Sequence, residues 1–204
     1  MTLLTKIKLH QKKLSACKQC ENMTPPPIIG QAIASKILLV GQAPGVKEPE
    51  LQRPFAWTAG KTLFKWFDSI GVDEEQFRSS VYMSAVCRCF PGKNPKGGDR
   101  VPSKEEIIRC SQWLNAELDL LQPTLLLPVG KLAISQYMEC KKLVDVIGKL
   151  HRVEVAGYEL DIVPLPHPSG ASTWHNMQPG KSLLQDALQI IQQHSAWQDI
   201  VDKN

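Results

Sequence analysis

The stretch "KILLVG" (Lys36 to Gly41) is a short apolar run that ends in glycine, as buried parallel strands often do. Three later runs share this character and also stop near Gly or Pro: "VYMSAV" (residues 81–86), "TLLLPVG" (124–130) and "LDIVPL" (160–165). Together they predict the four strands of one central sheet.

The segments between these runs have the periodicity of helices. Apolar residues recur at three- and four-residue spacing in residues 59–71 and 103–121, and the second segment opens with a Ser103/Glu106 pair at capping-box spacing. Residues 181–201 predict a closing amphipathic helix, and residues 151–165 predict a hairpin that turns at Ala156-Gly157. We therefore expect an α/β protein: a three-layer α/β/α sandwich with a central, mainly parallel four-stranded sheet. Its ligand site should lie at the carboxyl ends of the strands.

Composition narrows the class of protein. The chain has 204 residues, of which 43% are hydrophobic and 22% charged, which suits a single domain over residues 1–204 with a basic N-terminal arm over residues 1–35. The sequence shows neither the apolar core of a signal peptide nor a run of about 18 apolar residues, so we expect a cytoplasmic protein without a membrane partner. We also expect a monomer. A net charge of +4 suits a polyanionic partner but is also ordinary.

Six cysteines in a reducing compartment favour metal ligands, buried thiols or redox groups over a disulfide framework. Cys17 and Cys20 form a close pair in "CKQC", and Cys89 and Cys110 stand at the two ends of "CFPGKNPKGGDRVPSKEEIIRC". These four are candidate ligands, with buried unligated thiols as the alternative.

The loops after the strands carry the candidate functional residues. Gly41 and Gly45 flank Pro44 in a tight turn that lets the backbone approach a ligand, although glycine and proline also make purely structural turns. "AGKT" (residues 59–62) resembles half of a phosphate loop, but Phe55 stands where that pattern needs glycine. We therefore exclude a nucleoside triphosphatase.

Taken in order, these motifs resemble the uracil-DNA glycosylase superfamily and are most similar to its iron–sulfur family 4 enzymes. "GQAPG", "RPFAWTAG", "CRCFPG", the later helix cysteine and "HPS" correspond, in altered form, to that family's G-E-A-P-G, R-P-F-x-G-x-A-G, T-N-x-x-K-C-x-P-P, helix cysteine and H-P-S patterns. The correspondence runs from Cys17 to Ser169. It implies a DNA partner that contains a damaged base.

The resemblance also implies roles for particular residues. Phe55 stacks on a flipped base, beside a pocket made by the backbone of Gly41, Gln42 and Ala43. His167 donates to the carbonyl oxygen of the departing base. Four further residues are expected on the DNA. Lys61 contacts a DNA phosphate or stays solvated, and Ser169 and Gly170 hold a phosphate. Trp174 wedges into the base stack or packs under its own loop.

By the same resemblance, Cys17, Cys20, Cys89 and Cys110 would hold a [4Fe–4S] cluster, with a four-cysteine zinc site as the alternative. Cys89 rather than Cys87 is the third ligand, because it follows Ala85 by four residues and precedes Phe90-Pro91-Gly92. Cys87 and Cys140 are then ordinary thiols. The cluster would lie near a basic stripe that is also compatible with a solvated face: Lys93, Lys96 and Arg100.

Two departures from the family pattern concern the substrate. Gln42 replaces the glutamate after the first glycine, and its amide orients a water but cannot take its proton. Ala85 replaces the asparagine that reads uracil, which suggests a broader base pocket. The loop over residues 92–103 holds no histidine, so we expect no covalent capture of the sugar. We expect a monofunctional DNA base-excision glycosylase for uracil or another modified base, with a DNA-binding protein of little turnover as the alternative.

Overall fold

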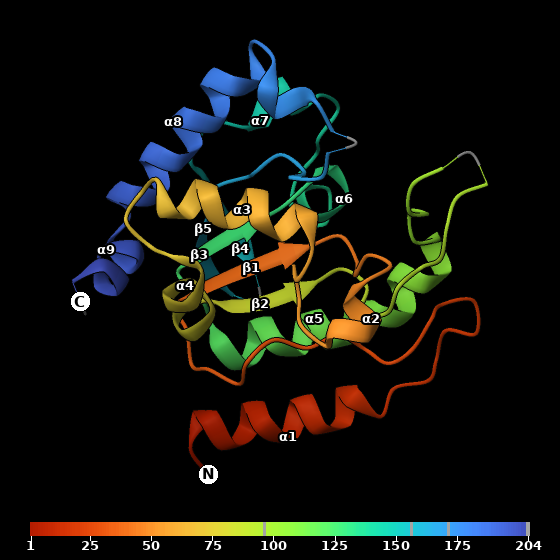
Figure 1. The fold of residues 1–204 in the computed structure, drawn as a ribbon. Coiled ribbons are helices and arrows are strands. Elements are labelled where there is room, and N and C mark those ends of the chain that lie inside the picture. Colours follow the sequence, from red (N-terminus) through yellow and green to blue (C-terminus); the bar gives the residue numbers. More distant parts are fainter. Residues whose placement is uncertain (96, 156, 171, 203–204) are drawn as a thin grey trace.

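Three of the apolar runs form strands where the sequence predicts them: β1 (Ile37–Gly41), β2 (Tyr82–Ala85) and β3 (Leu125–Pro128). The computed structural model describes residues 1–95, 97–155, 157–170 and 172–202 (Figure 1). The fourth run is shifted: β5 covers Tyr158–Ile162, and a bridge between Val129 and Leu165 continues its alignment with β3. Strands β1, β2, β3 and β5 are mutually parallel where they pair.

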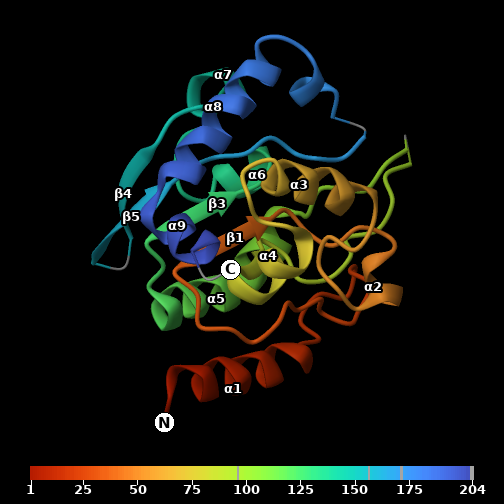
Figure 2. The same cartoon turned by 60° about the vertical axis from the view of Figure 1, so that its left-hand side comes forward.

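The strand count of the prediction is wrong by one. In the described residues the sheet has five strands in the order β2-β1-β3-β5-β4, because β4 (His151–Val155) joins as an antiparallel edge strand. Figure 2 shows the β4–β5 hairpin at one edge of the sheet. Ala156 of the predicted hairpin turn lies outside the described residues, whereas Gly157 has the positive φ of 79° that suits a turn.

Alternation along β1 creates two cores, one on each face of the sheet. Ile37 and Leu39 pack into one core with helices α3 (Thr58–Asp68), α4 (Glu74–Ser80), α8 (Gly180–Gln193) and α9 (Ser195–Val201). Leu38 and Val40 pack into the other with α5 (Lys104–Leu121). The result is the expected three-layer α/β/α sandwich.

Two helical segments differ from the sequence expectation. The N-terminal arm begins with helix α1 (Leu3–Ser15), which runs beneath α5 in Figures 1 and 2 and buries Ile7, His10 and Leu14. The predicted closing helix is divided into α8 and α9, because His194 adopts an extended backbone and its Nδ1 accepts the N–H of Ala196. The predicted Ser103/Glu106 capping box at the start of α5 is confirmed.

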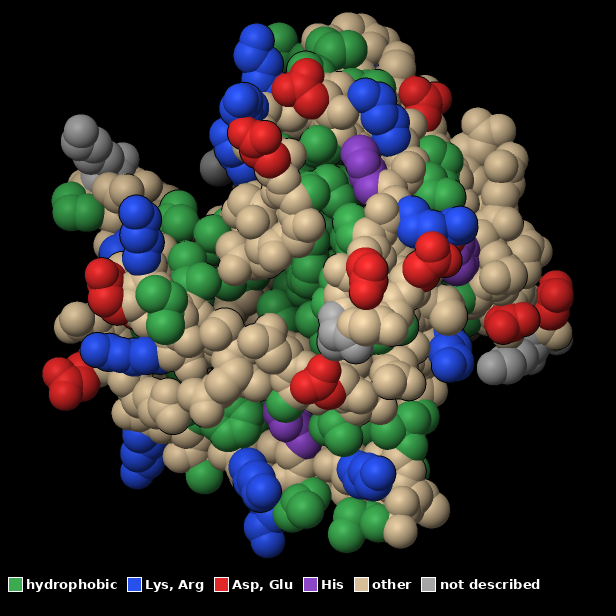
Figure 3. Space-filling view, turned by 180° about the vertical axis from the view of Figure 1, so that it is seen from behind, with side chains coloured by type: hydrophobic (Ala, Val, Ile, Leu, Met, Phe, Trp, Pro, Cys, Tyr) green, Lys and Arg blue, Asp and Glu red, His purple; other side chains and the backbone are tan. Residues whose placement is uncertain are grey.

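Short elements complete the fold: α2 (Glu48–Leu51), α6 (Lys131–Ile134), α7 (Leu143–Val146) and the 3₁₀ turn η1 (Trp174–Asn176). None of the helices in the described ranges combines the length and apolar character that a bilayer crossing needs. Seen from behind, lysine and arginine side chains alternate with aspartate and glutamate around a hollow lined by hydrophobic side chains (Figure 3). This face therefore carries both signs of charge.

The connections between the strands determine where a ligand-binding crevice can form. The chain leaves β1 through α3 and α4 on one face of the sheet to reach β2, and then returns through α5 on the other face to β3, on the opposite side of β1. The strand order thus reverses at β1. In open parallel sheets, loops diverge at such a point and leave a crevice at the carboxyl ends of the strands.

Candidate functional site

The carboxyl ends of neighbouring strands gather the predicted base-pocket residues. Gly41 at the end of β1 pairs in register with Ala85 at the end of β2. On the other side of β1, Gly130 follows β3 and its N–H donates to the carbonyl oxygen of Leu165, two residues before His167. The first, second and last motifs therefore lie close together at the carboxyl ends of the parallel strands.

Phe55 lies against the end of β1. A Cβ built on Gly41 would stand 3.0 Å from Cζ of the Phe55 ring, so glycine gives the ring room there. Phe55 has a φ of 51°, a left-handed conformation that is uncommon for a bulky residue. The backbone of Gly60 packs on the Phe55 carbonyl so closely that an added Cβ would clash with its oxygen. The aromatic predicted to stack on a base is thus held in a constrained position.

His167 is partly buried and is oriented by Ser169. The backbone N–H of Ser169 donates to His167 Nδ1 at 3.2 Å, and the Ser169 Oγ lies 2.9 Å from the same nitrogen. Because Nδ1 accepts, the proton of the neutral ring is assigned to Nε2. Burial lowers the pKa of His167 below its ordinary value of 6.5. The ring packs on Gly130, where a Cβ would stand 3.0 Å from Cδ2.

Gln42 and Ala43 form the loop that leaves β1. The carbonyl oxygen of Gln42 accepts the N–H of Cys87 at 3.0 Å, which joins this loop to the segment after β2. Gln42, Ala43 and Ala85 are half-buried, so their surfaces stay partly accessible at the strand ends. An amide offers a donor and an acceptor to a ligand, whereas the Ala85 side chain offers neither.

Two carboxylates beside this loop escaped the sequence analysis. Glu48 is 7% exposed, and burial is the main cause that raises its pKa. A Cβ on Gly45 would stand 2.9 Å from Glu48 Oε2 and 3.2 Å from Asp99 Oδ2, so both side chains approach the same turn. Asp99 also bonds to Lys93 at 2.7 Å. Asp99 is far from the glycine motif in sequence, so no pattern could have grouped it with Gly45; Glu48 follows Gly45 closely, but only the fold shows that its carboxylate is buried against this turn.

The residues predicted to contact DNA differ in their surroundings. Lys61 and Gly170 are exposed, and Ser169 is half-buried through its contact with His167. Trp174 is half-buried and packs on Gly180 at the start of α8, where a Cβ would come within 2.7 Å of its ring. Trp57, which the sequence analysis passed over, is 49% exposed just before α3. Whether these residues bind DNA stays a prediction.

The predicted basic stripe is largely neutralised within the chain. Lys93 pairs with Asp99, and Arg100 makes two hydrogen bonds of 2.8 Å to the carboxylate of Glu106. Arg100 also donates to the carbonyl oxygen of Asn22, which ties the loop to the cysteine arm. Lys96 lies outside the described residues. Arg100 therefore ties the loop to α5 and to the cysteine arm, whereas Lys93 stays exposed to solvent while it pairs with Asp99.

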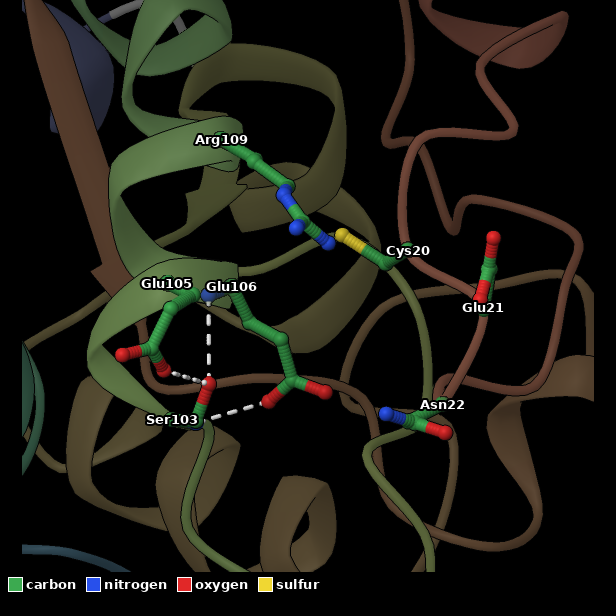
Figure 4. A pocket seen from close by; sticks show the side chains of 7 residues that line it. All are labelled: Cys20, Glu21, Asn22, Ser103, Glu105, Glu106 and Arg109. Atoms are coloured by element: carbon green, nitrogen blue, oxygen red, sulfur yellow. Dashed lines mark hydrogen bonds between the residues drawn. The ribbon is translucent and has the colours of Figure 1, made fainter.

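The four predicted cysteine ligands line one cavity of about 360 Å³ between the arm, the loop after β2 and helix α5: Cys17, Cys20, Cys89 and Cys110. A smaller neighbouring pocket, at the start of α5, has Cys20 and Arg109 on its wall, and the Arg109 side chain points toward the sulfur (Figure 4). Burial is the main cause that raises the pKa of Cys89 to about 12 and also raises that of Cys20.

Cys87 is fully buried and contacts Cys110. A hydrogen bond from the Cys87 thiol lowers the pKa of Cys110 and raises that of Cys87 itself. As the chain stands, no group of three or more His, Cys, Asp or Glu side chains among the described residues is arranged to hold a metal ion. The geometry thus brings the four cysteines to one cavity without converging them on a single centre.

A buried ionic network lies behind this cavity. Arg88, which also lines the cavity, is 2% exposed and pairs with Glu117 of α5. The carboxylate of Glu117 accepts hydrogen bonds from Tyr82 Oη at 2.9 Å and Ser84 Oγ at 2.7 Å. His10 of α1 lies 3.3 Å from the same carboxylate. The network joins α1, β2 and α5, and it was not visible in the sequence because its members are far apart.

Comparison with known proteins agrees with this architecture. The family description "Uracil DNA glycosylase superfamily" matches residues 27–192, from the linker before β1 into α8. The chain is 30% identical over 138 residues to a Type-4 uracil-DNA glycosylase of Pyrobaculum aerophilum, a match that covers 65% of this chain and 66% of that protein. It is 29% identical over 168 residues to the Type-4 uracil-DNA glycosylase of Archaeoglobus fulgidus, covering 78% and 79% of the two chains.

A third relative, the Type-4 uracil-DNA glycosylase of Thermotoga maritima, is 28% identical over 158 residues, with 78% of this chain and 77% of the relative covered. The family match over residues 27–192 therefore includes the sheet and the loops at the carboxyl ends of its strands. Gly41, Phe55 and His167 lie together at the carboxyl ends of the strands. Because the family match also covers most of its length, the chain belongs to the uracil DNA glycosylase superfamily.

Proposed function

We propose that this chain is a monofunctional DNA glycosylase that hydrolyses the N-glycosidic bond of a flipped uracil or of another deaminated or modified base. Relatives named Type-4 uracil-DNA glycosylase support the class of reaction. The observation that carries the proposal is the orientation of His167. Its Nδ1 is occupied by the Ser169 N–H, which leaves the Nε2–H free to donate to a ligand.

His167 would act on the departing base. As the bond between C1′ and the base nitrogen breaks, the electron pair stays on the base and negative charge grows on its carbonyl oxygen. A neutral imidazole that donates from Nε2 stabilises this charge, and the low pKa of His167 keeps the ring neutral near pH 7. The donor is already oriented by Ser169, so little reorganisation is needed during the reaction.

Gln42 would position the water. The oxygen of that water bonds to C1′ of the sugar, and its proton passes to solvent or to the departing base. The Gln42 amide can hold the water but cannot accept the proton, so the proposed mechanism depends on departure of the base rather than on a strong nucleophile.

The base pocket would be formed by Phe55 on one side and by the backbone of Gly41, Gln42 and Ala43 on the other. Phe55 offers a stacking face, and Ala85 leaves space where an amide would read the base edge. We propose that this pocket accepts uracil and also larger or differently substituted bases. Lys61, Ser169, Gly170 and Trp174 are proposed to hold the flanking DNA.

We further propose a [4Fe–4S] cluster at the four-cysteine cavity. A zinc site requires four thiolates that converge on one ion. The thiolates that hold a cubane cluster would instead surround it from the walls of a cavity. The donor set and the cavity lined by Cys17, Cys20, Cys89 and Cys110 fit this requirement. When bound, the group would cross-link the arm, the loop and α5 beside the DNA path.

The alternative is a DNA-binding protein that keeps the fold but hardly turns over. Gln42 and Ala85 favour it, because each removes a side-chain function from the family pattern. The orientation of His167 favours the enzyme, since a binding protein has no need of a donor that acts on a leaving group.

A cleavage assay distinguishes the two proposals. Anaerobically purified protein is incubated, in excess, with single- and double-stranded oligonucleotides that carry uracil, hypoxanthine, xanthine or 5-substituted uracils, and the abasic product is cleaved by alkali. We expect excision of at least one base and no covalent protein–DNA product. Tight binding without excision of any base in the panel would favour the binding protein.

A further inference from the structure

Beneath the Phe55 backbone lies a buried arginine that the glycosylase motifs do not include. Arg78 belongs to α4 and is 4% exposed. Its Nη1 donates to the carbonyl oxygen of Pro54 at 2.8 Å, and its Nη2 donates to the carbonyl oxygen of Phe55 at 3.1 Å. One guanidinium group thus binds the carbonyl oxygens on both sides of the Phe55 N–H and Cα.

The guanidinium is itself fixed by its surroundings. Nε donates to Glu74 Oε1 at 2.9 Å, and the guanidinium carbon lies 4.4 Å from the centre of the Phe64 ring. The Met83 sulfur lies 3.9 Å from Nη1. Because these partners belong to α4, α3 and β2, Arg78 is anchored to the core, and the loop that carries Phe55 is anchored to Arg78.

This anchor acts where the backbone is constrained. A bulky residue at a φ of 51° is strained and persists only when its surroundings hold it in place. On one side the Phe55 carbonyl meets the Gly60 backbone at the start of α3, and on the other it meets Arg78. With the carbonyl held between them, the ring is directed onto Gly41 at the end of β1.

We propose that Arg78 is a positioning residue that sets the Phe55 ring for stacking on the flipped base; the inference rests on the proposed function. The planar fork of arginine matches two adjacent carbonyl oxygens, whereas the single ammonium of lysine cannot hold both in the same geometry. Burial lowers the pKa of Arg78, and Glu74, its carboxylate partner, is 43% exposed. Burying the Arg78 charge costs free energy, and the exposed Glu74 carboxylate compensates this cost only in part. Such an arrangement is expected where the loop that carries Phe55 must keep one orientation.

The test is a double-mutant cycle between Arg78→Gln and Phe55→Ala, read as single-turnover excision of the base that the wild-type enzyme prefers. If Arg78 acts through the ring, Arg78→Gln lowers the rate by up to about a hundredfold when Phe55 is present, since a misplacement of about 1 Å has effects of that size. It has little further effect in Phe55→Ala, because the ring is already absent. Affinity for undamaged DNA stays at the wild-type level.

The control is Arg152→Gln, which removes an arginine from a surface ion pair with Asp161 on the edge hairpin and should leave the rate unchanged. Equal losses from Arg78→Gln in both Phe55 backgrounds, or no loss in either, would overturn the inference. Arg78→Lys keeps the buried charge if Arg78→Gln fails to fold, and it should lower the rate by a smaller factor in the same Phe55-dependent way.

A measurement without catalysis separates this inference from the proposed function. The chain has five phenylalanines, so 4-fluorophenylalanine labelling gives a simple ¹⁹F spectrum in which Phe55→Leu assigns the Phe55 resonance. Arg78→Lys should shift or broaden the Phe55 resonance, and also that of Phe64, whose ring lies directly against the guanidinium. An unchanged Phe55 resonance would refute the positioning role, whereas a wild-type enzyme that excises no base would refute only the proposed function.

Discussion

Replacing His167 with alanine is expected to lower the single-turnover excision rate by about 10²–10³-fold, which corresponds to about 2.7–4 kcal/mol of transition-state stabilisation. This range applies to the loss of one preorganised donor. The structure supports the upper part of it, because the ring is partly buried and its Nδ1 already accepts the Ser169 N–H at 3.2 Å. A donor that is oriented and partly desolvated acts more strongly than one in water.

Ser169→Ala provides a graded comparison. This variant removes the Oγ that lies 2.9 Å from His167 Nδ1 but keeps the backbone N–H that assigns the proton to Nε2. Loss of one hydrogen bond costs about 0.5–1.5 kcal/mol, so the rate should fall by about tenfold or less. The expected order of rates is therefore wild type, Ser169→Ala and then His167→Ala.

The titration of His167 gives a second measurement. Its folded-state pKa lies below the ordinary value of 6.5, so the native state binds fewer protons than the unfolded state in this range. The contribution of His167 to stability is therefore fully present above the unfolded pKa and is lost as the pH falls from about 6.5 through the folded pKa. Denaturant unfolding of wild type and His167→Ala between about pH 8 and about pH 5 should show a steeper loss for wild type.

The assay uses enzyme in excess over oligonucleotide with rapid quenching, and DNA affinity is measured separately on undamaged duplex. His167→Ala should bind this duplex as wild type does, with the same salt dependence, because phosphate contacts dominate affinity. A His167→Ala enzyme that excises the base at the wild-type rate would show that the donor to the leaving base has been misassigned.

Three other changes test the remaining features. Ala85→Asn should shift the preference among bases toward uracil, measured on the same oligonucleotide panel, and an unchanged preference would contradict the proposed base-reading position. Cys89→Ser should lose bound iron by elemental analysis and the broad absorbance near about 400 nm, whereas Cys87→Ser should keep both; equal iron in the two variants would refute the choice of Cys89. Glu117→Ala should destabilise the fold by about 3–5 kcal/mol in denaturant titration, because it leaves Arg88 buried without its carboxylate, and a loss below about 1 kcal/mol would contradict this reasoning.

The features that local sequence determines were predictable. The central strands follow from short apolar runs that end at glycine or proline, and the start of α5 follows from the Ser103/Glu106 capping box. Gly41, Ala85 and His167 lie at the same end of the sheet because parallel strands place their carboxyl ends together; that these residues line a base pocket stays a prediction.

The sequence prediction was wrong where contacts with distant residues, rather than local periodicity, decide the secondary structure. Strand β4 (His151–Val155) was assigned to a hairpin but not counted in the sheet, because its half-buried alternation does not show that β5 brings it to the edge. The closing helix looked continuous, but His194 caps the N–H of Ala196 and lies 3.5 Å from Asp161 of β5. Both outcomes depend on neighbours that local periodicity does not specify.

The sequence by itself thus determined the parallel strands of the sheet, the helices α3 and α5 between them, and the family motifs at the strand ends. Only the tertiary structure decided how these motifs are held: the packing of His167 on Gly130, the burial of Arg88 beside the cysteine cavity, and the hydrogen bonds from Arg78 to the Phe55 backbone. The physical reason is the separation in sequence over which each kind of interaction acts. Strand propensity and helix caps act within a few residues, whereas hydrogen bonds between residues 23 or more positions apart form only when packing of the core brings them together.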